Sequence, residues 1–261
     1  MVVTPWEVKG DIDYDKLIEQ FGVSRMTPEI EDKIAEHAGF KHLQLRRGVY
    51  LSHRDTEWWI KEYEKGNKVG LYTGRGPSGN VHLGHLVPWF FCAYLQEAFD
   101  ADMYFQMTDD EKFLHRPDLS LEEAVGYTYE NALDVIACGL KPGKTHIFSD
   151  TEDIEHLYKI ALRVAKKVTF STAKAVFGLT DSDNIGKIWY PAMQAMTCFL
   201  ESDREGRNIP CLIPAAIDQD PYWRVTRDIA QKLGYYKPAQ IHAKFLPGLA
   251  EGGKMSASQP D

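Results

Sequence analysis

The chain has 261 residues, of which 44% are hydrophobic and 26% are charged, a balance typical of soluble globular proteins with one or two domains. This composition excludes collagen-like, disordered and disulfide-scaffold proteins, and the apolar runs are too short to cross a membrane. The net charge of −8 argues against a general nucleic-acid coat. Because the first residues also lack the pattern of a signal peptide, we expect a cytoplasmic protein with no membrane partner.

The first sixty-odd residues read as helical. Asp13 is a suitable cap for a short helix that should end at Gly22. A second helix is predicted to begin at residues 27–29, where a capping threonine, a proline and a glutamate follow one another, and to end near Gly39. A third helix, which contains two adjacent tryptophans, should end at residues 65–67.

From Lys68 onwards, strands alternate with helices. A capping box formed by Ser120 and Glu123 predicts a helix that closes at Gly139. The alternation predicts an α/β fold with a doubly wound parallel sheet, which binds ligands beyond the carboxyl ends of its strands. The predicted strands cover residues 69–74, 103–107, 145–149, 211–217 and 241–246.

Smaller expectations concern cysteines and aromatic residues. The scattered cysteines lie in apolar stretches without a C-x-x-C pair and are predicted to be buried free thiols (Cys92, Cys138, Cys198 and Cys211). The aromatic side chains of the helix after residue 82 are expected in the core (Trp89, Phe90, Phe91, Tyr94 and Phe99).

A glycine-rich loop, RGPSGN, follows the first predicted strand and leads into a helix. Glycines let a backbone pass close to a ligand, and a helix start offers free N–H groups with partial positive charge. His82 and His85 lie three positions apart near that helix start. Together with Arg75, they suit a phosphate that gains negative charge during attack. By itself the loop fits a tight turn equally well.

A second loop, GGKMSAS, follows the last predicted strand. Lys254 with Ser256 and Ser258 on a glycine-led loop can donate several hydrogen bonds to a polyphosphate. On its own this segment would read as an ordinary mobile tail, and the pair of loops is the more specific signal.

The motif H-L-G-H followed by K-M-S-A-S resembles the two signature motifs of class I aminoacyl-tRNA synthetases. The segments YTGRGPS, QMTDDEKFL, FSD, TDSDNIGKI, PAMQA and LIPAAIDQDPYWRVTRDIA are similar to the tryptophanyl-tRNA synthetases of the archaeal and eukaryotic branch. The resemblance covers nearly the whole chain. It implies a Rossmann-like fold with a helical insertion and a helical N-terminal extension.

The resemblance also implies an activity and its site. L-tryptophan would react with ATP to form tryptophanyl-adenylate and pyrophosphate, with transfer to tRNA(Trp) in a full-length protein. Mg²⁺ would accompany ATP, without a fixed metal site in the protein. The implied catalytic residues are His82, His85, Arg75 and Lys254. The implied ATP-binding residues are Gly76, Gly84, Asp218, Met255, Ser256 and Ser258. The implied tryptophan-binding residues are Tyr72, Gly74, Gln106, Thr108, Glu111, Lys112, Gln194 and Gln219.

The same resemblance divides the chain. Residues 1–66 would form the N-terminal extension and residues 67–261 the catalytic domain, with a helical insertion at about 119–177 that makes a homodimer. Family members continue into a helical anticodon-binding domain, which we expect to be absent here because the chain ends at Asp261, so tRNA charging should be weak or missing.

Three other functions remain as alternatives. A tyrosyl-tRNA synthetase would differ around the second strand and in the AIDQDPYWR segment. Small nucleotidyltransferases also use H-x-G-H, but they lack a K-M-S-A-S loop. A non-catalytic binding or signalling fragment of the synthetase would keep the fold without turnover.

Overall fold

The structure is a computed structural model, and it describes residues 2–3, 8–9 and 12–246. The N-terminal part mixes helices with short strands, some of which join the main sheet. Its elements are β1 (Val2–Val3), β2 (Val8–Lys9), α1 (Tyr14–Phe21), β3 (Ser24–Arg25), α2 (Pro28–Ala38), α3 (Leu43–Arg46), β4 (Tyr50–Arg54) and α4 (Thr56–Glu64). The three predicted helices of this part are confirmed as α1, α2 and α4.

The remainder of the chain alternates strands and helices, as predicted. Its elements are β5 (Gly70–Arg75), α5 (Leu83–Phe99), β6 (Asp102–Met107), α6 (Asp109–His115), α7 (Leu121–Ala137), β7 (Thr145–Ser149), α8 (Ile154–Ala165), α9 (Phe170–Phe177), α10 (Ile185–Glu205), β8 (Cys211–Ala216), η1 (Ile217–Gln219), α11 (Asp220–Ala230), η2 (Gln231–Leu233) and β9 (Ala239–Ala243). The capping box at Ser120 is present with both hydrogen bonds.

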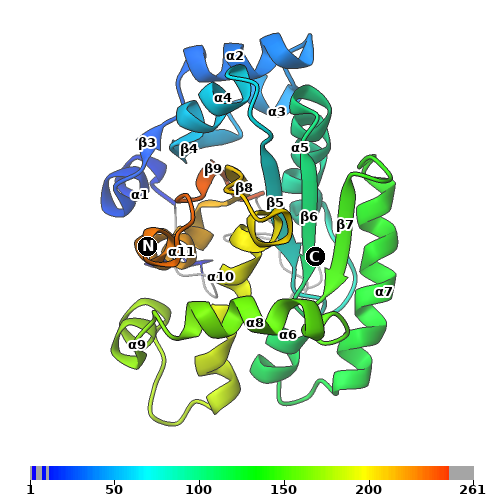
Figure 1. Ribbon diagram of the computed structural model, residues 1–261, viewed down its shortest axis with the longest axis vertical. Coiled ribbons are helices and arrows are strands. Elements are labelled where there is room, and N and C mark those ends of the chain that lie inside the picture. Colours follow the sequence, from blue (N-terminus) through cyan, green and yellow to red (C-terminus); the bar gives the residue numbers. More distant parts are fainter. Residues whose placement is uncertain (1, 4–7, 10–11, 247–261) are drawn as a thin grey trace.

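A seven-stranded sheet with the order β3-β4-β9-β8-β5-β6-β7 forms the centre of the molecule (Figure 1). The five strands from β5 onwards are parallel, which confirms the predicted doubly wound sheet. β4 pairs antiparallel with β9, and β3 pairs antiparallel with β4. The prediction that the first sixty-odd residues are helical is therefore wrong for β3 and β4, because β4 finds its partner β9 at the far end of the chain and β3 pairs with β4.

Side chains that alternate along the strands pack into two apolar cores. Leu71 and Phe105 face the core that α2, α4, α5 and α7 cover, whereas Tyr72 and Tyr104 face the core that α8 to α11 cover. Most aromatic side chains of α5 are buried as predicted. Phe90 is the exception, with 44% of its surface exposed, because it points away from the sheet while its neighbours on either side point inward.

Two further expectations need adjustment. The stretch at 119–177 is not wholly helical, because β7 lies inside it and forms the edge of the sheet next to β6. All four cysteines are free as predicted, but Cys211 is only partly buried. Within the described residues, no helix is long and apolar enough to span a membrane.

The strand order reverses at β5, which is flanked by β6 on one side and β8 on the other. In the described part of the chain, β5 and β8 pair at just two positions, Gly70 with Cys211 and Leu71 with Leu212. Beyond Leu71 the two strands diverge, and the sheet opens at their carboxyl ends. Such a switch point is where open α/β sheets bind their ligands.

Candidate active site

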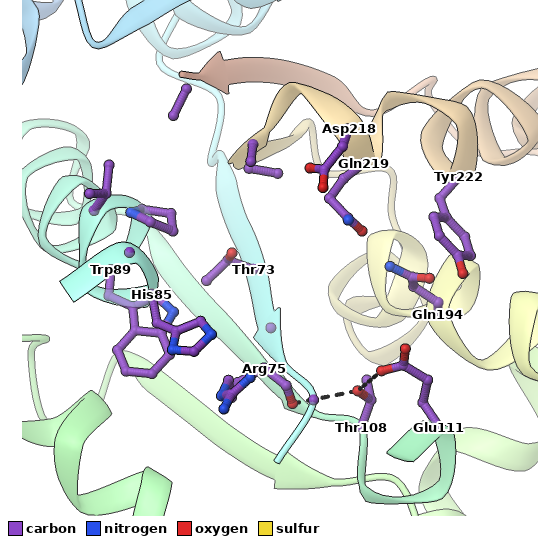
Figure 2. A pocket seen from close by; sticks show the side chains of 18 of the residues that line it. Thr73, Arg75, His85, Trp89, Thr108, Glu111, Gln194, Asp218, Gln219 and Tyr222 are labelled. Carbon is purple, nitrogen blue, oxygen red and sulfur yellow. Dashed lines mark hydrogen bonds between the residues drawn. The ribbon is translucent and has the colours of Figure 1, made fainter. Parts of the chain in front are cut away.

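A cavity of about 880 Å³ lies at this switch point, within the size range of small-molecule sites. Its walls come from β5, the loop after β5, the start of α5, α6, α10 and the turn after β8. Figure 2 shows His85 and Trp89 of α5 on one side, Asp218, Gln219 and Tyr222 on the opposite side, and Arg75 between them.

The structure brings most predicted site residues to this one cavity. It is lined by Tyr72, Gly74, Arg75, Gly76, His82, Gly84, His85, Thr108, Glu111, Lys112, Gln194, Asp218 and Gln219. Gln106 does not line it but contacts Tyr72 directly. Lys254, Met255, Ser256 and Ser258 lie outside the described residues.

Two histidines close the first turn of α5. His82 is the N-cap, and its Nδ1 accepts a hydrogen bond from the Gly84 N–H at 3.2 Å, while Nδ1 of His85 accepts from the His82 N–H at 3.2 Å. The rings stack with their centroids 3.7 Å apart. Because both Nδ1 atoms accept, each neutral ring carries its proton on Nε2 and can donate from that atom. The two rings therefore supply directed donors next to a helix N-terminus.

Arg75, the last residue of β5, is buried in the cavity wall. Its Nε donates to Oδ1 of Asn131 on α7 at 3.1 Å, and Nδ2 of Asn131 donates to the Gly79 carbonyl at 3.2 Å. Asn131 therefore holds both ends of the glycine-rich loop. Burial lowers the pKa of Arg75 to about 10, so the guanidinium stays charged at neutral pH. Its Nη2 has no hydrogen-bond partner among the described residues, which leaves a donor for an anion.

Tyr72 and Gln106 come from neighbouring parallel strands and form a buried pair. The Tyr72 hydroxyl donates to Oε1 of Gln106 at 2.5 Å. Nε2 of Gln106 donates to both carboxyl oxygens of Asp150, at 2.8 and 2.9 Å. Since the phenol proton points to Gln106, the lone pairs of the Tyr72 oxygen can accept a hydrogen bond from a ligand.

An acidic and a basic group lie together at the start of α6. Oε1 of Glu111 accepts from Lys112 Nζ at 3.0 Å. Its Oε2 accepts from the Thr108 hydroxyl at 3.0 Å, a bond that Figure 2 shows. Burial would raise the pKa of Glu111, but the charge and hydrogen bonds of Lys112 outweigh it and lower that pKa. Glu111 is therefore ionised at neutral pH, with Lys112 as a neighbouring cation.

The opposite wall carries polar side chains from α10 and from the turn after β8. Asp218 is 2% exposed and lies on the short helix η1 beside Gln219. Oε1 of Gln194 is buried without a hydrogen-bond partner among the described residues. Buried acceptors of this kind are costly without a partner, and a ligand with donors would supply one.

The sequence interpretation missed several residues that shape the site. Asp150 follows β7 directly, and its place after a strand was an available signal. Asn131 lies in mid-helix, where no local pattern distinguishes it. Aromatic side chains that line the cavity were also missed, namely Tyr190, Tyr222 and Trp223.

One carboxylate cluster of metal-binding geometry lies among the described residues, away from the cavity. It consists of Asp102, Glu201 and Glu205. The ammonium of Lys68 contacts all three carboxylates, so a side-chain cation already balances their charge. This arrangement is that of a partly exposed ion-pair network in which Glu201 alone is buried.

The chain matches the family model described as "tRNA synthetases class I (W and Y)" over residues 64–261. It is 52% identical to the tryptophan–tRNA ligase of Saccharolobus solfataricus over 99% of this chain and 67% of that protein. It is also 52% identical to the tryptophan–tRNA ligase of Pyrobaculum calidifontis, over 100% of this chain and 70% of that protein.

The fold agrees with these sequence matches. A tryptophanyl-tRNA synthetase from Encephalitozoon cuniculi bound to tryptophan superimposes with a TM-score of 0.87 at 40% identity, over 91% of this chain and 70% of that chain. The synthetase from Plasmodium falciparum gives 0.87 at 46% identity, over 91% and 66%. The chain therefore belongs to the class I aminoacyl-tRNA synthetases of the tryptophan and tyrosine group and, within it, to the tryptophan–tRNA ligases.

Proposed function

We propose that this chain activates L-tryptophan with ATP in the cavity beyond β5 and β8, forming tryptophanyl-adenylate and pyrophosphate. The observation that carries the proposal is the buried Tyr72–Gln106 pair. Its hydroxyl proton is committed to Gln106, so the pair offers an acceptor where an indole offers its single donor. The relatives' names support tryptophan as the amino acid and tRNA as its acceptor.

The charged groups on α6 and an amide on α10 suit the other end of an amino acid. The ionised Glu111 and the partnerless Oε1 of Gln194 are acceptors for an α-ammonium group. The neighbouring Lys112 supplies a cation for the α-carboxylate. Binding the ends of the amino acid in this way would orient its carboxylate for attack.

ATP would occupy the side of the cavity formed by α5 and the η1 turn. The Nε2 donors of His82 and His85 fit triphosphate oxygens, and the buried carboxylate of Asp218 can accept from ribose hydroxyls. The loop with Lys254 and its two serines, outside the described residues, is proposed to contact pyrophosphate.

Chemistry at the α-phosphate needs no covalent intermediate on the protein. A carboxylate oxygen of tryptophan attacks the α-phosphorus. The bond between that phosphorus and the oxygen that bridges the α- and β-phosphates breaks, and pyrophosphate leaves with the electron pair. Negative charge grows on the phosphate oxygens during this step. The Nη2 group of Arg75 is held in a buried part of the cavity wall before the reaction begins. A cation that is already in place in this way stabilises the developing charge and lowers the barrier.

Mg²⁺ would neutralise part of the triphosphate charge. The described residues show no carboxylate cluster beside the cavity that would hold the ion by itself. The donor set of the cavity, with its histidines and Arg75, instead fits an anionic nucleotide. We therefore propose that Mg²⁺ enters bound to ATP.

We also propose that the chain forms a homodimer through α7 and α8. Tyr129, Leu133 and Ile136 form an exposed apolar stripe on α7, and Tyr158 and Leu162 are exposed on α8. The Tyr129 hydroxyl donates to Glu152 just before α8, which places the segment before α8 next to α7. Exposed apolar patches of this kind typically mark protein interfaces. Sedimentation should give a dimer, and Leu133→Glu should shift it to a monomer.

The proposed reaction is tested by ATP–pyrophosphate exchange with tryptophan, tyrosine and phenylalanine in parallel. Exchange with tryptophan alone is expected. Exchange with tyrosine instead would contradict the role of the Tyr72–Gln106 pair. No exchange with any of the three, in folded protein, would favour a binding module that lacks turnover.

A further inference from the structure

We infer that Asp150 is a positioning residue that fixes the polarity of the Gln106 amide and so sets the preference for an N–H-bearing side chain. The inference rests on the proposed function, because it concerns how the same cavity recognises tryptophan. Asp150 is 1% exposed and is not among the cavity-lining residues. It therefore acts through Gln106.

The amide of Gln106 is surrounded by acceptors on one side and by a donor on the other. Its Nε2 faces the two oxygens of Asp150 and also the Met193 carbonyl at 3.4 Å. Its Oε1 faces the Tyr72 hydroxyl. With the amide turned over, its oxygen would face three acceptor oxygens at the same distances. The observed orientation is therefore the one that the surroundings permit.

A second carboxyl group, that of Asp110, lies next to Asp150 and leaves it able to accept hydrogen bonds from Gln106. Asp150 and Asp110 share a hydrogen bond. Burial raises the pKa of Asp150 well above its ordinary range, and the neighbouring charge of Asp110 adds to the shift. A proton shared between these two carboxyl groups is held more tightly than by an ordinary aspartate, because burial raises the pKa of both. The remaining lone pairs of Asp150 accept from Gln106 whether or not that proton is present.

The direction of the hydrogen bonds along Asp150, Gln106 and Tyr72 decides whether the Tyr72 oxygen can accept a hydrogen bond from a ligand. Because Gln106 accepts the phenol proton, Tyr72 presents lone pairs to the cavity. If the Gln106 amide turned over, its N–H would donate to the Tyr72 oxygen, and the phenol proton would turn to the Gln194 carbonyl, the other acceptor, 3.3 Å away. A ligand N–H would then compete with the Gln106 N–H for the lone pairs of the Tyr72 oxygen. Sites built to pair with a substrate N–H discriminate through the cost of leaving that pairing unmade.

A backbone hydrogen bond also holds Asp150 in place, independently of the side-chain hydrogen bonds. Its N–H donates to the Met107 carbonyl at 3.1 Å, which continues the pairing of β6 with β7 by one residue. Gln106 lies one residue before Met107 on β6. The carboxyl and the amide are thus set by two paired strands of the sheet, which is the rigid support that a specificity contact requires.

The test compares tryptophan with benzothienylalanine, which has the same bicyclic shape but a sulfur atom in place of the N–H. The assay is ATP–pyrophosphate exchange. In Asp150→Asn, the new amide can present N–H as well as oxygen to Gln106, so the Gln106 amide is no longer held in one orientation. We expect kcat/KM for tryptophan to fall on the order of tenfold. The value for benzothienylalanine, measured as substrate or as inhibitor, should change by less than about twofold.

The ratio of the two values is the decisive quantity, because a smaller fraction of folded protein lowers both equally. Asp228→Asn is the matched control, since it makes the same chemical change at an exposed position of α11, and its ratio should equal that of the unaltered chain. If Asp150→Asn is insoluble, Asp150→Ser is measured in the same way. An unchanged ratio in the soluble variant would overturn the inference. Absence of exchange in the unaltered chain would instead overturn the proposed function.

Discussion

Asn131 offers a direct test of how the glycine-rich loop is held. Asn131→Ala removes the acceptor of Arg75 Nε and the donor to the Gly79 carbonyl. Arg75 is buried and the Gly79 carbonyl bond is partly buried, so water replaces neither bond in full. The change leaves the Arg75 guanidinium without its fixed bond at one nitrogen, while its Nη2 already has no partner among the described residues.

The expected size of the effect follows from these two bonds. A buried bond to a charged group contributes about 2 kcal/mol and a neutral one about 1 kcal/mol, so the free energy of unfolding should fall by about 3 kcal/mol. Misplacing a catalytic group by about 1 Å can cost about a hundredfold in rate. We therefore expect kcat of the exchange reaction to fall between about tenfold and a hundredfold. The KM for tryptophan should change little, because Asn131 contacts neither Tyr72 nor Gln106.

Exchange kinetics and thermal unfolding measure both parts of this prediction. Asn131→Asp keeps an acceptor for Arg75 but loses the donor to Gly79, so its loss of kcat should be intermediate. Glu130→Ala, at an exposed neighbouring position of α7, is the control and should behave like the unaltered chain. A folded Asn131→Ala protein with an unchanged kcat would refute the reasoning.

Three further outcomes are expected. Gly74→Ala should lower exchange activity at least tenfold, because a Cβ there would lie 2.8 Å from the Gln106 carbonyl oxygen and would push β5 from β6; kinetics equal to the unaltered chain would contradict this. Burial lowers the pKa of His242 to about 4, below the roughly 6.5 of an exposed histidine. The contribution of neutral His242 to the free energy of unfolding is therefore complete above the pKa of the unfolded state and is lost as pH falls towards the pKa of the folded state. Between pH 7 and pH 5 the free energy of unfolding should therefore fall by about 2 kcal/mol, and denaturant unfolding of His242→Gln should show a smaller fall. Arg54→Met should destabilise the fold by about 3 kcal/mol, because it leaves the buried Asp220 without the partner now 2.6 Å away; an unchanged melting temperature would count against this.

The features predicted correctly from sequence are those that depend on neighbours along the chain. The caps at Asp13 and Ser120, and the helix that begins after His82, each involve residues within three or four positions. The strands after Lys68 were recognised because short apolar runs were bounded by loops and helices. The resemblance named candidate binding residues, and most of those that the structure describes line one cavity.

The missed features depend on contacts between distant segments. β4 has five residues, and it is a strand because β9 lies alongside it. Asn131 and Arg75 are 56 positions apart, and Asp150 lies 44 positions from Gln106. Local propensity carries no information about such pairs. Phe90 was misplaced for a related reason, since only the position of the helix against the sheet decides which side faces solvent.

The antiparallel pairing of β4 with β9 has a consequence for the order in which the molecule is built. Ser52 and His242 face each other across this pairing, 190 positions apart. At roughly 5–20 residues per second of synthesis, β4 waits on the order of ten seconds or more for its partner strand. β5, β6 and β7 can pair during that interval, because the helical crossovers that join them are much shorter than the segment between β4 and β9. The segment that is made first thus completes the sheet last, and the two tryptophans of α4 would report that late step by fluorescence during refolding.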